Sequence, residues 1–427
     1  MNGDYIIPEN FGDAQEGIES YTYNTFYPEN NSSLNTYDDT RFRLNNKEAN
    51  FHFHAGYFLI KGQLKKTDNT DLPNDANSTF INNGPNYMFR NVAWAINGID
   101  YENINYNGQV STMLKYIKTN GDQRYTDGLT TCWSPDTDAT TTATNKGREA
   151  RKLWTITSPH TNGNFTFAIK LSDIFGLAEN NKFMFGVSHE FKLLRQSDNY
   201  ALYKAGTLDY SAKIDIKSIT LVVPIVTLKD DALLKYKENI LNNIPQDIKY
   251  LRRYATSMTI PANVRNHTWA VQTMPYLQRG KFMILGFQIG NTMDQKFNYG
   301  LFKHANIQTI SVSVNQIQIP RYAPELNFSE NDFLPIYKQM EDLKMNYFQI
   351  SDQIQQVGIN PSAFKDLTTL YCFDLTKREH EYIGSTVDIK INMTFRSETK
   401  AKTICFALIL NEQDLYIHPE GSKITSR

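Results

Sequence analysis

The chain has 427 residues, and 40% of them are hydrophobic. This length is too great for one ordinary domain and suits two domains of roughly 200 residues. Lys and Arg number 44 against 45 for Asp and Glu, so the net charge is -1, which argues against a dedicated nucleic-acid-binding protein. The three cysteines have no metal-binding spacing and cannot all pair. We expect Cys372 and Cys405 to be small buried side chains in a protein made in a reducing compartment.

The N-terminal region carries only negative charge. The first 40 residues contain no Lys or Arg, and their acidic residues are Asp4, Glu9, Asp13, Glu16, Glu19, Glu29, Asp38 and Asp39. Such a stretch repels phosphate, so we interpret residues 1–19 as a solvated, partly flexible leader and not as a genome-binding arm. The leader lacks the basic and apolar regions of a signal peptide, so we predict no secretion signal.

The first half of the chain consists mainly of segments in which apolar and polar residues alternate, a pattern typical of β-strands. One helix interrupts them, because apolar residues between 110 and 117 follow the spacing of a helical face. In chain order we predict strands within 51–64 and 93–99, a helix over 110–119, and strands within 165–177, 182–194 and 218–228.

Two segments of the first half allow predictions about exposure to solvent and insertion into a membrane. Residues 119–152 are rich in Thr, Asp, Asn and Gly, and we expect them to form a long exposed loop inserted into the first domain. The longest apolar run, 219–228, contains Pro224 and is far shorter than the ~20 residues of a membrane-spanning helix. We therefore predict no membrane insertion.

The second half presents the same kinds of element in the same order. A helix predicted over 230–244, with Asp230 as its N-cap, separates the two halves. The segment "KYLRRYA" (249–255) follows it as the first strand of the second half. Beyond it we predict strands within 281–290 and 310–319, a helix within 329–350, and strands within 368–376, 385–395 and 403–410.

This shared order indicates that the chain contains two copies of one all-β domain. In each copy a strand leads to an Asn turn, at Asn97-Gly98 and at Asn315-Gln316, and a helix follows. Eight short strands per copy are typical of a jelly roll, so the predicted fold is two tandem eight-stranded jelly rolls with a few inserted helices. We place the first jelly roll at 20–229, a linking helix at 230–249 and the second jelly roll at 250–427.

Signatures of catalysis and metal binding begin in several places but none is complete. The segments "HEFKL" at His189 and "HEYIG" at His380 lack the second His of a zinc helix, and the calcium-loop pattern that starts at Asp136 lacks its Gly. His52 and His54 would share a face of a strand, yet no nearby residues complete a zinc site. We therefore predict no catalytic, cofactor-binding or metal-binding residues.

Aromatic residues make up 13% of the chain, and Tyr and Phe suit wide sheets and protein interfaces. They could also stack on sugars or on the bases of a single strand. The segment 249–255 is the one tight grouping of aromatic and basic residues, and its position at the start of the second copy favours a structural role.

Several segments together resemble one protein family. They are "INGIDYENI", "STMLKYIKT", "FMILGFQIGN", "FKHANIQTISVSVNQIQIP" and the helical "IYKQMEDL". The chain resembles, from about residue 21 to its end, the double jelly-roll major capsid proteins of Polinton/Maverick elements and of adintovirus-like and virophage-like DNA viruses, distant relatives of the adenovirus hexon. One departure is Gln316, where Gly is expected after Asn315, so the second turn is expected to differ from the first.

The resemblance implies a structural protein and not an enzyme. Three chains would form a pseudo-hexagonal capsomer of an icosahedral shell, with loop 119–152 at its top and both termini on its inner face. The implied partners are other copies of the chain, neighbouring capsomers and penton or minor capsid proteins, with packaged double-stranded DNA contacted only indirectly. The implied location is the virion, after synthesis in the host cytoplasm.

Two other functions remain open from the sequence. A double jelly-roll enzyme that processes glycans, such as an amidase, would need an acidic and aromatic cleft between the two barrels. A sugar-binding protein would need exposed aromatic clusters on its loops. Both share the expected fold with a capsid protein, so the fold alone does not decide among them.

Overall fold

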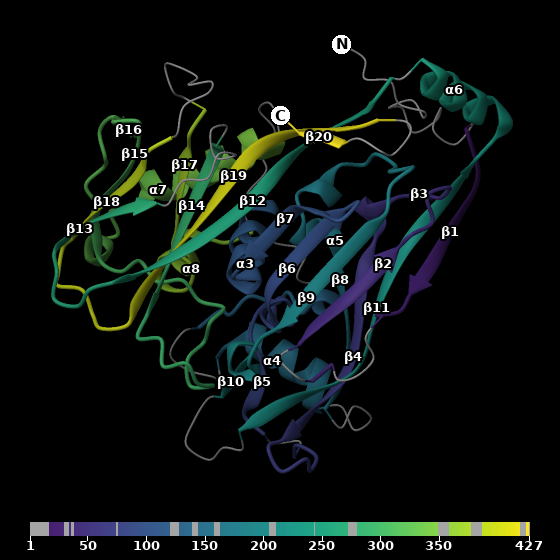
Figure 1. Ribbon diagram of the computed structural model, residues 1–427. Coiled ribbons are helices and arrows are strands. Elements are labelled where there is room, and N and C mark those ends of the chain that lie inside the picture. The colour runs from purple at the N-terminus through teal and green to yellow at the C-terminus, as the bar shows by residue number, and fades with distance from the viewer. Residues whose placement is uncertain are drawn as a thin grey trace.

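The computed structural model (Figure 1) describes residues 17–29, 34–35, 38–73, 76–119, 128–138, 144–157, 163–204, 211–242, 244–271, 280–348, 358–376, 387–418 and 424–426. The leader predicted at 1–19 therefore lies almost wholly outside the described residues, and so does His380. No helix among the described residues is long and apolar enough to cross a membrane.

The first half of the chain forms two antiparallel four-stranded sheets that face each other. The first has the order β1-β11-β4-β8, made of Ile18–Phe26, Ala212–Leu228, Tyr57–Lys66 and Asn164–Lys170. The second has the order β2-β9-β6-β7, made of Asp39–Leu44, His189–Arg195, Phe89–Ile96 and Ile99–Asn105. Short additions are β3 (Asn50–Phe51), which pairs with β11, and the pair of β5 (Ser78–Phe80) and β10 (Leu202–Lys204).

The second half repeats this arrangement strand for strand. One sheet has the order β12-β19-β14-β17, made of Gln246–Ile260, Thr403–Ile417, Gly280–Ile289 and Leu370–Asp374. The other has the order β13-β18-β15-β16, made of Asn266–Val271, Ile389–Phe395, Ile307–Val314 and Ile317–Ile319, and β20 (Ile424–Ser426) adds to β19. In both halves one sheet joins the first, last, third and sixth main strands, so the predicted pair of eight-stranded jelly rolls is confirmed.

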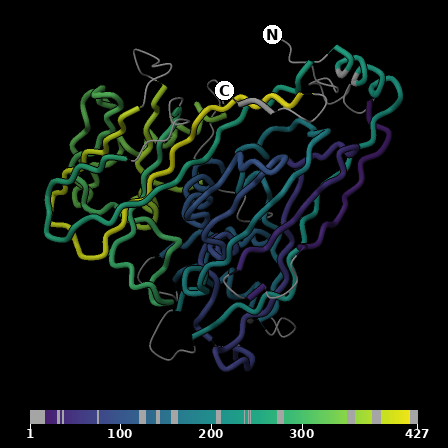
Figure 2. Tube along the Cα trace, in the orientation of Figure 1, coloured from purple at the N-terminus to yellow at the C-terminus, as the bar shows by residue number. Residues whose placement is uncertain are grey.

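The helices sit mainly in the connections between strands. The predicted helices are present as α3 (Asn107–Lys118), α6 (Asp230–Leu241) and α7 (Leu334–Phe348). The shorter ones are α2 (Gly84–Tyr87), α4 (Lys146–Lys152), α5 (Leu171–Ile174) and α8 (Pro361–Asp366). Figure 2 follows the trace from the first half, through α6, into β12, which runs beside β19 over its whole length.

Three predicted strands are shorter than the alternation suggested. Residues 53–55 form a 3₁₀ turn before β4, residues 171–174 form α5 after β8, and β9 begins only at His189. In each case the apolar residues still point inward, as the buried Phe53, Leu171 and Met184 do. Alternating apolar and polar residues indicate only that one side of a segment is buried. An irregular segment or a short helix at the end of a barrel can bury the same residues as a strand would.

The described part of the segment 119–152, residues 119, 128–138 and 144–152, is not the fully exposed loop that its composition predicted, and residues 120–127 and 139–143 lie outside the described residues. Within its described residues Trp133, Asp136, Arg148 and Arg151 are all at most 4% exposed. Cys132 is also buried, as are Cys372 and Cys405, and all three thiols are free. Polar composition misled the prediction because a buried polar segment is stable when its donors and acceptors are paired, as described below.

The two Asn turns have the same conformation, although a different turn was expected after Asn315. Asn97 and Gly98 have φ values of 49° and 80°, and Asn315 and Gln316 have 47° and 71°. The backbone N–H of each Asn donates to the residue before the neighbouring strand, Ser188 or Asp388, and its side-chain oxygen accepts from that residue's N–H. The turn is thus fixed by the Asn, and Gln316 adopts the left-handed conformation that Gly98 adopts at no steric cost.

We expect Gln316→Gly to stabilise the protein by about 1 kcal/mol, because a left-handed residue with a Cβ costs about 1–2 kcal/mol. Urea unfolding of the two proteins would measure the difference. Gly98→Gln is the reciprocal variant and should destabilise by a similar amount. A stability loss in Gln316→Gly would show that the Gln side chain makes a compensating contact.

Candidate functional site: the junction between the two halves

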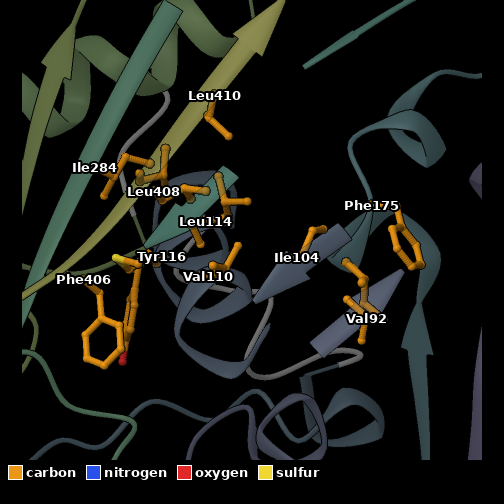
Figure 3. Packing of buried hydrophobic residues seen from close by; sticks show 14 of the residues in the cluster. Val92, Ile104, Val110, Leu114, Tyr116, Phe175, Ile284, Phe406, Leu408 and Leu410 are labelled. Atoms are coloured by element: carbon orange, nitrogen blue, oxygen red, sulfur yellow. The ribbon is translucent and has the colours of Figure 1, made fainter. Parts of the chain in front are cut away.

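Helix α3 fills the space between the two jelly rolls. Its apolar residues Val110 and Leu114 point toward Ile284, Leu408 and Leu410 on the outer face of the sheet β12-β19-β14-β17 (Figure 3). The register of β14 against β19 places Ile284 opposite Leu408, so these residues share one face. The first half therefore supplies a helix, and the second half a flat apolar sheet face, to one continuous buried contact.

This contact explains a feature of the sequence. The segment 403–410 of β19 is apolar at nearly every position instead of alternating. One set of its side chains, including Cys405 and Ile409, points into the second barrel, and the other set, including Phe406 and Leu408, points to the first half. A strand buried on both faces is expected to be continuously hydrophobic.

The junction also contains a buried network of charges. Arg253 on β12 donates to the carboxylate of Glu179, which also contacts the ammonium group of Lys118 on α3 and accepts from the hydroxyl group of Tyr347 on α7. The guanidinium group of Arg253 donates further to the backbone oxygens of Asp173 at 2.7 Å and Ser172 at 2.9 Å. Burial alone would raise the pKa of Glu179, but Lys118 and Arg253 outweigh it and hold this pKa below its usual value.

Glu102 on β7 completes the network from the other side. Its carboxylate accepts backbone N–H groups of Gly176 at 3.1 Å and Leu177 at 2.9 Å, and of Arg253 in the second half at 3.4 Å. Burial raises the pKa of Glu102 above its usual value, although the charge of Arg253 and the N–H groups oppose this. The backbone and the side chain of Arg253 thus both hold strand β12 to the first half.

Helix α3 makes two further polar contacts at the junction. Lys115 lies 2.9 Å from the carboxylate of Asp173, in an ion pair that is largely shielded from solvent. Lys344 of α7 is fully buried and donates to the backbone oxygen of Thr119, just after the C-terminus of α3, at 3.3 Å. A cation at that position complements the helix dipole as well as its free carbonyl groups.

The unexpectedly buried residues between 128 and 138 and between 144 and 152 form a second bridge. The carboxylate of Asp136 accepts hydrogen bonds from the guanidinium group of Arg151 at 2.7 Å and from the side-chain amide of Asn145 at 2.8 Å, and both residues belong to the same segment. It also receives the amide of Asn298 in the second half at 3.0 Å. The carboxylate of Asp136 is therefore engaged by N–H donors, which is a structural role and not that of a calcium ligand.

The histidines considered as metal ligands lie outside the junction network or already form hydrogen bonds with other residues. His52 precedes the 3₁₀ turn and His54 lies within it, with their rings stacked, and His52 forms hydrogen bonds with Tyr21 at 2.8 Å and Asn181 at 2.7 Å. His189 is buried beside Trp94, and burial lowers its pKa to about 3, so it is neutral. Among the described residues, no group of three or more His, Cys, Asp and Glu residues is arranged to hold a metal ion.

A cavity of about 190 Å³ lies where the two halves meet. Tyr106 and Gln109 line it from the first half, and Ser257 and Phe406 from the second. Its described lining includes one charged side chain, Arg90, and no acid, so it holds no pair of carboxyl groups for acid–base catalysis.

Sequence reasoning missed the junction network. Arg253 lies in the segment 249–255, which was correctly predicted as a strand, but nothing in one sequence pairs it with Glu179 or Glu102. One signal in the sequence could have indicated such a network: charged residues occur inside elements that are otherwise apolar. A charge that becomes buried needs a partner.

Comparison with known proteins gives one family and several similar structures. A family model described as a double jelly roll-like domain matches residues 79–415. The chain is similar to the Sputnik virophage structure determined by cryo-EM, with a TM-score of 0.62 and 12% identity over 96% of this chain and 89% of that one. It is also similar to the mavirus major capsid protein, with a TM-score of 0.59 and 10% identity over 95% of this chain and 90% of that one.

A third similar structure is the Faustovirus major capsid protein, with a TM-score of 0.51 and 10% identity over 97% of this chain and 92% of that one. No curated protein sequence matches the chain. At these identities the likeness is one of fold, and it extends over both halves of the chain.

Proposed function

Because the chain belongs to the double jelly roll-like domain family, we propose that it is a major capsid protein that tiles the icosahedral shell of a DNA virus or virus-like transposon. The observation that carries this proposal is a likeness to viral major capsid proteins that spans nearly the whole chain. A shared fold does not fix function, so the chemistry of the junction must fit as well.

The junction fits a structural role. The carboxylate of Glu102 is buried and those of Asp173 and Glu179 are largely shielded from solvent, and all three are engaged by cations or backbone N–H groups, which leaves them unavailable as general acids or bases. The described lining of the cavity between the halves contains no acidic side chain, whereas a glycan-processing enzyme needs an acidic cleft. The junction instead holds the two barrels in one fixed relation, as a tile requires.

In the proposed assembly three chains form a pseudo-hexagonal capsomer of six barrels, residing in the virion. Each chain contributes a first jelly roll at 20–229 and a second that was predicted to begin at 250 and whose first strand, β12, starts at Gln246 after α6, with the leader 1–19 and the C-terminus facing inward. The partners are neighbouring capsomers and penton or minor capsid proteins. The net charge of -1 keeps electrostatic repulsion between many packed copies small.

Light scattering of the purified protein, followed by negative-stain imaging of the same peak, tests the proposal. We expect a mass of about three times 49.2 kDa and hexagonal tiles or closed shells. A stable monomer that is retained on a glycan array would contradict the capsid function and support the sugar-binding or glycan-processing alternatives.

A further inference from the structure

The cavity of about 190 Å³ where the two halves meet, the junction cavity, contains a buried polar side chain that no described residue pairs with. Gln109 of α3 lines this cavity and is only 6% exposed, yet its side-chain amide forms no hydrogen bond with any residue that the structure describes. Leaving such a group unpaired costs free energy, because it loses its bonds to water on burial. An unpaired amide in the wall of a cavity therefore points to a ligand.

The second half contributes a similar amide on the opposite wall. Asn291, which follows β14, lines the junction cavity and is 5% exposed. Its side-chain oxygen accepts hydrogen bonds from the hydroxyl group of Tyr299 at 2.9 Å and from the backbone N–H of Met293 at 3.0 Å. Because a backbone N–H can only donate, these bonds identify the oxygen of the amide, and the NH₂ group is the part that has no partner among the described residues. The junction cavity is thus supplied with an unused hydrogen-bond donor from the second half.

Two further features make the junction cavity attractive to an anion. Arg90 on β6 lines it, is exposed, and forms no ion pair with any part of the chain that the structure describes. Helix α3 begins at the cavity wall, and the N–H groups of its first turn have no partners within the helix. Its N-cap, Tyr106, offers no side-chain bond to them, and the first turn contains no acidic residue. Since the described lining also lacks an acid, the helix dipole and Arg90 act on a ligand with the same sign.

The rest of the lining suits a ring that has both apolar faces and hydroxyl groups. The rings of Tyr106 from the first half and Phe406 from the second meet edge to face, with their centroids 5.4 Å apart, and both line the cavity. On β12 the hydroxyl groups of Ser257 and Thr259 also line it, and neither bonds to another described residue. An aromatic acid would contact the rings but leave these hydroxyl groups unpaired, whereas a sugar ring offers C–H groups to the first and hydroxyl groups to the second.

The size of the junction cavity limits the ligand to one ring. A cavity of about 150 Å³ accommodates a benzene ring. The junction cavity, at about 190 Å³, therefore has room for one six-membered ring with its substituents and not for a chain of sugars. Its exposed residues Arg90 and Met293 give the rest of a longer glycan a path to solvent.

We propose that the junction cavity binds one acidic sugar residue of a glycan, a six-membered ring that carries a carboxylate or a sulfate group. The anionic group lies against Arg90, the first turn of α3 and the NH₂ group of Asn291, and the ring lies against Tyr106 and Phe406. This site goes beyond the capsid function and does not rest on it. In a shell of many copies, weak sites of this kind would together hold the particle to a surface rich in acidic glycans.

Saturation-transfer NMR titrations of the full-length protein test the proposal with four probes. Two are acidic sugars, methyl glucuronide and the sulfate ester of methyl glucoside. The others are methyl glucoside, which has the ring without the charge, and inorganic sulfate, which has the charge without the ring and is measured by competition. We expect a Kd on the order of 1 mM for at least one acidic sugar, because one ring makes few contacts, and binding about ten-fold weaker for the two controls. The tighter of the two acidic sugars identifies the anionic group.

Variants of the lining locate the site. Arg90→Leu should weaken binding of the acidic sugar about ten-fold and remove its advantage over methyl glucoside, because the charged hydrogen bonds are lost. Gln109→Leu keeps the volume of the side chain but removes the amide, and it should also weaken binding. Arg265→Leu is the matched control, since Arg265 is exposed and lies outside the cavity lining. Thermal unfolding verifies that each variant is folded, and Arg90→Leu carries the test if Gln109→Leu is not.

Four results would overturn the proposal. They are no binding of either acidic sugar, equal binding of methyl glucoside, inorganic sulfate that binds as tightly as the acidic sugars and so acts as an adventitious ion only, and undiminished binding to folded Arg90→Leu. The capsid function is judged separately by light scattering. A trimer that binds no acidic sugar leaves the capsid function standing, and a monomer that binds one contradicts the capsid function but leaves this site standing.

Discussion

Replacing Arg253 by Leu is expected to lower the free energy of unfolding by about 3–5 kcal/mol, because it leaves a buried charge without its partner. The Arg253 side chain is fully buried, and it reaches Glu179 together with two backbone oxygens of the first half. Its removal leaves Glu179 with Lys118 and Tyr347 alone, and it removes a positive charge near Glu102. Urea unfolding followed by tryptophan fluorescence would measure the loss.

Lys249→Leu is the matched control, since Lys249 lies on the same strand but is exposed, and we expect a change within about 0.5 kcal/mol. The double variant Arg253→Leu/Glu179→Leu should recover part of the loss, because removing both charges avoids an unpaired one. A loss below about 1 kcal/mol in Arg253→Leu would mean that the network contributes little to holding the halves together.

Gly176→Ala is expected to weaken the junction itself and to cost about 3 kcal/mol, the upper end of the range for overpacking. A Cβ at Gly176 would lie 1.9 Å from the backbone oxygen of Leu251 on β12, and a backbone atom in a sheet cannot move aside. The φ of Gly176 is -66°, which Ala adopts without strain, so the cost arises only from the contact between the halves. Hydrogen exchange should show lost protection in β12 and in residues 176–179.

Gly98→Ala serves as the comparison for this change. A Cβ at Gly98 has no neighbouring atom within 4 Å, but the φ of 80° disfavours Ala. We expect a loss of about 1–2 kcal/mol, with the hydrogen exchange of β12 unchanged. Equal protection of β12 in both variants would show that Gly176 is not needed for close approach of the two halves.

Much of the fold follows from local patterns in the sequence. Alternation along β18 and the helical spacing in α3 report which side of each element is buried, and the repeated order of elements indicated two copies of one domain. The Asn turns were also recognisable, because Asn97 and Asn315 occupy matching positions. The left-handed conformation of Gln316 was not, since Gln rarely adopts it and the bonds between Asn315 and Asp388 impose it.

The junction depends on contacts that one sequence does not encode locally. Asp136 and Arg151 read as part of a polar loop, yet their mutual ion pair and the bond from Asn298 make burial favourable. Glu179 and Arg253 are 74 residues apart and meet only when the second half folds against the first. Which polar residues become buried is therefore decided by partners that approach from distant parts of the chain.

The two jelly rolls, their order and the main helices between strands could be predicted from the amino-acid sequence, because side-chain periodicity and turn residues act over a few neighbouring positions. Two outcomes follow only from the way the whole chain packs: α3 is covered by the second half, and the polar or aromatic Trp133, Asp136, Arg148 and Arg151 are buried. Such outcomes depend on how two completed barrels fit together, and their shape and charge arise from residues that are far apart in the chain.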